Sequence, residues 1–149
     1  MDLSEINFAV LVASLIVAST PLVLAALGEL IAEKSGVLNL GVEGMMIIGA
    51  VSGFIVGVET GSAYVGIIAA AVAGALLSLL FSFIILIMQA NQVASGLALT
   101  IFGLGIAALM GHPYTGIKSP QISTISIPIL NEIPIPGTMF FQHDLIVYL

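Results

Sequence analysis

Long apolar runs separated by short polar interruptions dominate this chain of 149 residues. An apolar helix of roughly 20 residues crosses a bilayer, and four runs have about that length. These runs cover 8–30, 37–58, 64–88 and 93–111, and short segments at 31–36, 59–63 and 89–92 connect them. Because such short connections force consecutive helices to lie antiparallel, the pattern predicts an all-α fold, a polytopic transmembrane helical bundle.

The pattern changes after the fourth run. Five prolines fall within 112–140, and proline both removes a backbone donor and breaks helices. We therefore expect a proline-rich loop outside the membrane, acting either as a plain connection or as an external lid or docking surface. Within it, 122–130 alternates polar and apolar residues, which favours a short extended piece. Residues 145–149 look like the start of a fifth span, and we expect the chain to be the N-terminal part of a longer subunit.

The composition supports a membrane location. Only 7% of the residues are charged, whereas soluble domains carry about 25%, so the chain cannot cover a water-facing surface. A net charge of -6 argues against nucleic-acid partners and a polybasic lipid-binding patch. There is no tryptophan, so an aromatic belt would use Tyr64, Tyr114, Tyr148 and phenylalanines. The chain is thus predicted to be an integral membrane protein with the lipid bilayer as a partner.

Two polar side chains interrupt the second run. Asn39 and Glu43 are four residues apart, so on a continuous helix they would share one face. An ionisable group inside a span is a functional candidate. Glu43 could pair with Lys34 as a structural lock, could be protonated and bonded to Asn39, or could line a substrate or proton path. All three interpretations stay open.

A second polar cluster, QANQVASG at 89–96, lies between the third and fourth runs. Asn91 and Gln92 could cap helix ends there or line a pathway. Lys34 and Lys118 fall on opposite sides of the membrane, so positive-inside counting gives a tie, and we place Lys34 in the cytoplasm. This topology brings the cluster and the Asn39 region to the same side, where we expect them to be neighbours.

Small residues recur every four positions in three consecutive runs, which predicts close helix packing. The ridge residues are Gly49, Gly53 and Gly57, then Gly66, Ala70, Gly74, Ser78 and Ser82, then Gly103, Ala107 and Gly111. They indicate either fixed packing or thin faces that let helices slide during a transport cycle. In the first run, Pro21 follows Ser19 and Thr20 and should kink the helix.

Catalytic signatures are missing from the sequence. It lacks the GxxxxGK[ST] and HExxH motifs, has no cysteine, and its two histidines, His112 and His143, are not at ligand spacing. We therefore expect no catalytic residues, no metal and no cofactor in this chain, and no nucleotide hydrolysis by it.

Two stretches carry a family resemblance: GELIAEKSGVLNLGVEGMMIIGA at 28–50 and ANQVASGLALTIFGLG at 90–105. They resemble membrane permease subunits of bacterial ABC importers of the branched-chain amino acid and simple-sugar type, particularly the nucleoside or simple-sugar branch. The resemblance implies a multi-pass protein of the bacterial plasma (inner) membrane that forms the translocation pathway by alternating access. It further implies a second permease chain, a different one, cytoplasmic ATP-binding subunits and an extracytoplasmic substrate-binding protein.

Two other functions stay open on the sequence. One is a secondary transporter with Glu43 as its ion or proton site, although no internal repeat is visible. The other is a non-transporting membrane scaffold. The family's coupling loop lies in the half that this chain lacks, so by itself it is not expected to couple to ATP hydrolysis.

Overall fold

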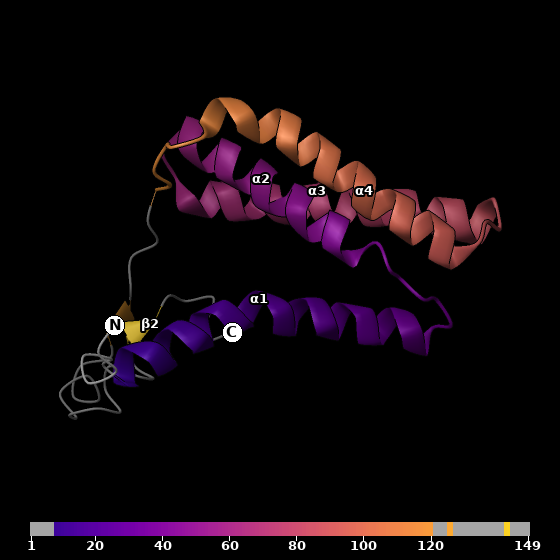
Figure 1. Ribbon diagram of the computed structural model, residues 1–149, viewed down its shortest axis with the longest axis horizontal. Coiled ribbons are helices and arrows are strands. Elements are labelled where there is room, and N and C mark those ends of the chain that lie inside the picture. Colours follow the sequence, from indigo (N-terminus) through magenta and orange to yellow (C-terminus); the bar gives the residue numbers. More distant parts are fainter. Residues whose placement is uncertain (1–7, 121–124, 127–141, 144–149) are drawn as a thin grey trace, which may run out of the picture. The chain divides into compact units, whose positions relative to one another are not determined.

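The computed structural model describes residues 8–120, 125–126 and 142–143. The chain divides into two compact units, Leu27–Gln121 and a second formed by Met1–Ala26 with Ile122–Leu149. The elements in chain order (Figure 1) are α1 (Phe8–Lys34), α2 (Val42–Thr60), α3 (Ala63–Ser82), the π-helical turn η2 (Phe83–Ile87), α4 (Gln92–Gly111), the 3-10 turn η3 (His112–Tyr114), β1 (Ile125–Ser126) and β2 (Gln142–His143).

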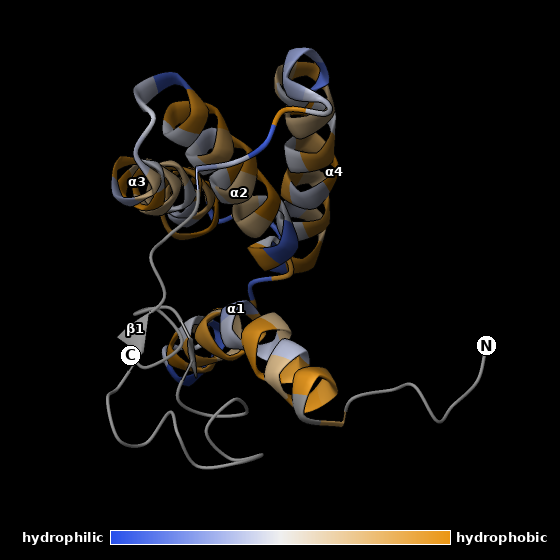
Figure 2. Ribbon diagram, turned by 90° about the vertical axis from the view of Figure 1, so that its left-hand side faces the viewer, coloured by the Kyte–Doolittle hydropathy of each residue, from blue (hydrophilic) through white to orange (hydrophobic). Residues whose placement is uncertain are grey.

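Among the described residues, four helices are long and apolar enough to cross a membrane, which confirms the predicted all-α fold with four spans. Figure 2 shows apolar residues along these helices, with polar residues concentrated near their ends. No residue in the most apolar window of α1 is buried, and apolar side chains on all its sides are exposed. Such a helix suits an apolar environment rather than water.

In the unit Leu27–Gln121, α2 packs against both α3 and α4, whereas α3 and α4 touch little (Figure 2). Glycine contacts bring α2 against α3 in antiparallel order. Polar contacts join Leu38, before α2, to Gln92 at the start of α4, and Glu59, near the end of α2, to Tyr114 just after α4. The buried core gathers where the three helices meet, and it consists of Met45, Leu77, Phe81, Ile85 and Leu99. Of these, Phe81 is the most deeply buried, at 2% exposure.

Two predicted span boundaries are wrong. Helix α1 continues to Lys34 instead of ending at residue 30, and α2 begins at Val42 instead of residue 37. The reason is a glycine C-cap: Gly36 has φ +83°, its N–H donates to the Glu33 carbonyl, and the Val37 N–H donates to the Ala32 carbonyl. This Schellman arrangement ends α1 and leaves 35–41 non-helical.

The third and fourth spans begin within one residue of the prediction, but the third ends irregularly. Its last turn is π-helical, and Gln89 then adopts φ +51°, the left-handed region that side chains other than glycine rarely enter. In α1, Pro21 lies inside a continuous helix, and the hydroxyls of Ser19 and Thr20 donate to the Ile16 carbonyl. The kink at Pro21 stays a prediction.

In the second unit, β1 and β2 pair antiparallel, with Ile125 opposite His143 and Ser126 opposite Gln142. The extended piece predicted at 122–130 is described at Ile125–Ser126 only. Most of the proline-rich segment, the predicted start of a fifth span at 145–149, and Tyr148 lie outside the described residues.

Candidate functional site

The segment 35–41, called the connector below, joins α1 to α2 without helical structure. Asn39 lies in its middle, and its Oδ1 accepts a hydrogen bond of 3.0 Å from the Gly41 N–H, two residues later. Asparagine side chains favour such local turns over helix. The expectation that Asn39 and Glu43 share one face of a continuous helix is therefore wrong.

Side chains from α1 and α4 bind the backbone of the connector. The Gln92 amide accepts from the Leu38 N–H at 2.8 Å, and its Nε2 donates to the Gly36 carbonyl at 3.4 Å. The Thr100 hydroxyl donates to the Leu40 carbonyl at 3.0 Å. Because non-helical backbone at or near membrane depth needs partners from the protein, these side chains replace the bonds that a helix would supply.

The beginning of α4 is shaped for this contact. Asn91 caps the helix, since its side chain accepts from the Ala94 N–H at 3.0 Å, and Gln92 follows as the first helical residue. One turn later, a Cβ on Gly96 would lie 2.9 Å from the Gly41 nitrogen and 3.0 Å from two Leu40 backbone atoms. The two polar segments predicted to be neighbours thus do meet. The contact joins the Gln92 side chain to the backbone of Gly36 and Leu38, and the side chains of Asn39 and Glu43 take no part in it.

Glu29 completes the site from α1. Its Oε1 accepts from the Asn39 N–H at 2.9 Å, and its Oε2 is buried without a hydrogen-bond partner among the described residues. Sequence reasoning did not single out Glu29. A usable signal existed, because Glu29 is a carboxylate within the apolar run 8–30.

Glu43 occupies a different position from the one expected. It is exposed and lies in the first turn of α2, because the helix begins at Val42 and not at residue 37 as the apolar run predicted. A negative charge is favourable at a helix N-terminus. The hydrogen bonds of Asn39 within the described residues are with Glu29, Met45 and Gly41, and not with Glu43.

Small residues bring α2 against both neighbours. On the α3 side, a Cβ on Gly53 would lie 2.8 Å from the Gly66 carbonyl oxygen and from the Ala70 Cβ, and a Cβ on Gly49 would lie 3.2 Å from the Ala70 oxygen. Gly57 packs beside Gly66, whose own Cβ would lie 3.1 Å from the Gly57 Cα. The faces meet backbone to backbone over this stretch.

The α4 side uses a contact that sequence reasoning missed. A Cβ on Gly44 would lie 2.6 Å from the Leu99 carbonyl oxygen, and one on Gly103 would lie 2.8 Å from the Gly44 Cα and oxygen. Ala107 is also buried, whereas a Cβ on Gly74 would be 3.8 Å from the Met45 oxygen, an ordinary contact. The four-residue spacing of small residues predicted Gly103 as a packing residue. It missed Gly44, which is not in register with Gly49, Gly53 and Gly57.

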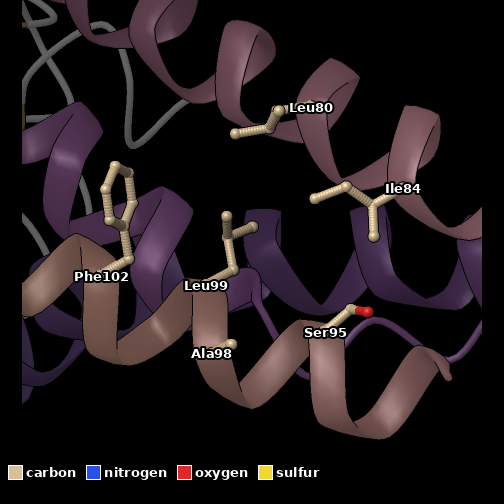
Figure 3. Close-up of a pocket in the computed structure, with 6 residues that line it drawn as sticks. All are labelled: Leu80, Ile84, Ser95, Ala98, Leu99 and Phe102. Atoms are coloured by element: carbon tan, nitrogen blue, oxygen red, sulfur yellow. The ribbon is translucent and has the colours of Figure 1, made fainter. Parts of the chain in front are cut away.

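A groove of about 400 Å³ opens where α3 and α4 diverge (Figure 3). It is lined by Leu80, Ile84, Ser95, Ala98, Leu99 and Phe102, so the Ser95 hydroxyl is its one side-chain polar group. A polar solute would leave most of its hydroxyl groups unpaired there, at a cost of a few kcal/mol each. The groove is therefore not suited to a polar substrate.

The arrangement has a clear chemical character. Its polar side chains hold backbone groups in place, and among the residues described here no group of three His, Asp or Glu side chains could hold a metal ion. The site is therefore suited to fixing helix geometry near the ends of spans, not to bond-making chemistry.

Comparison with known proteins gives concordant matches. Residues 11–141 match the family described as branched-chain amino acid transport system / permease component. A putative glucose ABC transporter permease of Haloferax volcanii is 38% identical over 89% of this chain and 41% of its own length. A guanosine ABC transporter permease of Bacillus subtilis is 37% identical over 95% of this chain and 48% of its own length. A nucleoside ABC transporter permease of Lactococcus lactis is 30% identical over 90% and 45%.

The chain spans about half the length of these curated relatives. No solved structure matches it significantly. The family match covers most of the chain, including all four helices that could cross a membrane apart from the first three residues of α1. This multi-pass membrane protein therefore belongs to the family of branched-chain amino acid transport system permease components.

Proposed function

We propose that the chain forms part of the membrane pathway of an ATP-driven importer for nucleosides or simple sugars. The observation that carries the proposal is the similarity to permeases named for glucose, guanosine and nucleosides along nearly all of this chain. Both solute classes are small and rich in hydroxyl groups, so a partly polar pathway suits them.

The importer would work by alternating access, with a second, different permease chain completing the pathway. Cytoplasmic ATP-binding subunits would hydrolyse ATP, and an extracytoplasmic protein would deliver the substrate. The backbone-to-backbone packing of α2 with α3 and α4 supports this proposal, because tightly packed helices move together as one piece. Asn39, Glu43, Asn91 and Gln92 stay candidates for the pathway.

Uptake assays test the proposal directly. The complete permease would be co-expressed with its partner subunits in a host lacking its own guanosine and glucose uptake, and accumulation of each radiolabelled solute would be followed. We expect ATP-dependent uptake of one of them, and its loss when the P-loop lysine of the ATP-binding subunit is replaced. Uptake that persists with the inactive ATPase would refute the proposal and favour a secondary transporter.

A further inference from the structure

We propose that Glu29 is a positioning residue for transport, which holds the connector in the conformation on which α4 packs. The inference deepens the proposed function and rests on it. Glu29 is the one side chain of α1 with a recorded hydrogen bond to the connector backbone, whereas Gln92 and Thr100 reach it from α4.

A continuous series of short contacts leads from Glu29 to α4. Its Oε1 accepts from the Asn39 N–H at 2.9 Å, and the Asn39 Oδ1 accepts from the Gly41 N–H at 3.0 Å. Gly41 directly precedes α2, and Gly96 of α4 packs on its backbone without room for a methyl group. Displacing Asn39 would therefore displace the surface that Gly96 contacts.

The chemistry of Glu29 argues against a role in packing alone. Its Oε2 is buried without a partner in the described part of the chain, and the group lies near the C-terminal end of α1. The buried oxygen disfavours a carboxyl group, because it has lost its water without gaining a partner. A polar group kept at such a cost in a membrane protein is a functional candidate.

Neighbouring charges do not offset this cost. The other charged residues of the last turn are Glu33 and Lys34, both exposed. Glu33 follows Glu29 by four residues, so it adds a like charge on the same helix face. Within the described residues, the carboxylate accepts its one hydrogen bond from the Asn39 N–H, so holding the connector is the interaction through which it acts.

Variants at position 29 test the proposal in the complete transporter. Glu29→Gln keeps an oxygen acceptor at the same reach, Glu29→Leu removes it, and Glu29→Asp keeps the charge but shortens the reach by one methylene. Glu33→Leu is the matched control, because it removes an exposed carboxylate one turn further along α1. Initial rates of radiolabelled guanosine and glucose uptake would be divided by the amount of assembled complex in the membrane.

We expect Glu29→Leu and Glu29→Asp to lower uptake per complex by about tenfold or more, the effect of losing one hydrogen bond to a charged group. Glu33→Leu should stay within about twofold of wild type, and Glu29→Gln, which keeps a neutral acceptor for Asn39, should lose no more than about fivefold. Hydrogen exchange of the peptide containing 37–41 should accelerate in the first two variants only. Should Glu29→Leu fail to assemble, the comparison of Glu29→Asp with Glu29→Gln decides the question.

Wild-type uptake in both Glu29→Leu and Glu29→Asp would overturn the positioning role, whether or not exchange at the connector becomes faster. An equal loss in Glu33→Leu would also overturn it, because the effect would then come from charge on α1. Failure of the proposed function looks different, since the wild-type transporter itself would lack ATP-dependent uptake. In that case unchanged exchange in Glu29→Leu would still refute the contact.

Discussion

A single methyl group placed at two positions of α4 gives a sharp test of the packing. A Cβ on Gly103 would lie 2.8 Å from the Gly44 Cα and oxygen, whereas one on Gly105 would have nothing within 4 Å. Both positions are helical, so Gly103→Ala and Gly105→Ala gain the same intrinsic helix propensity, about 0.5–1 kcal/mol. Any difference between them therefore measures the contact with α2.

The size of the difference follows from the geometry. The atoms opposing Gly103 are backbone atoms of α2 and cannot rotate away, so α2 and α4 would have to separate until the 2.8 Å contact reaches the 3.4 Å at which ordinary contact begins. Overpacking of this kind costs about 1–3 kcal/mol. After the propensity gain is subtracted, Gly103→Ala should destabilise the protein by about 0–2.5 kcal/mol, whereas Gly105→Ala should be neutral or slightly stabilising.

Thermal unfolding in detergent, followed by circular dichroism at the helix band, checks this expectation. A chain of this size shifts its Tm by about 2–4 °C per kcal/mol, so the two variants should differ by several degrees in the stated order. Equal Tm values for Gly103→Ala and Gly105→Ala would show that α2 and α4 are not held at backbone contact there. The packing argument for the whole α2–α4 interface would then fall.

Three further substitutions probe the backbone of the same unit. Gln92→Leu removes both side-chain hydrogen bonds to the connector, should lower the stability by about 1–3 kcal/mol and should speed hydrogen exchange at 36–40. Unchanged exchange would show that Gln92 does not hold the connector. Gln89→Gly relieves φ +51° and should raise the Tm by the equivalent of about 1 kcal/mol, whereas a lowered Tm would show that the glutamine side chain contributes more than the strain costs. Gly61→Ala, at φ +67° after α2, should lower the Tm by about 1 kcal/mol, with Gly61→Asn less affected, and an ordering reversed in the melting curves would argue against a left-handed cap there.

The lengths of the apolar runs were sufficient to predict the number and approximate places of the spans, because each run is long enough to cross a bilayer. It failed at the junction of the first two runs, where the apolar residues Val37, Leu38 and Leu40 continue the pattern without being helical. Hydropathy does not distinguish a helix from an apolar segment whose backbone is paired by side chains. The local signal was Gly36, whose left-handed φ ends α1.

The polar contacts were less accessible to sequence reasoning. Proximity of the Asn39 region to the 89–96 cluster followed from topology, but the pairing of Gln92 with Leu38 spans 54 residues and depends on the exact course of the connector. Glu29 was overlooked because it lies at the end of a run and resembles an ordinary boundary charge. The burial of its Oε2 and its hydrogen bond with the Asn39 N–H depend on the course of the connector, which hydropathy does not predict.

The place of α2 between its two neighbours explains a feature of its composition. Its most apolar window has a mean hydropathy of 1.6, the lowest of the four candidate spans, although α2 has the most extensive packing in its unit. A helix that packs on protein on two sides needs less lipid-compatible surface, so glycines can replace large apolar side chains and permit backbone contact. Glycine gains little from burial by itself, so α2 is stable as a span only when α3 and α4 cover it. We therefore expect α2, its two neighbours and the connector to behave as one structural unit.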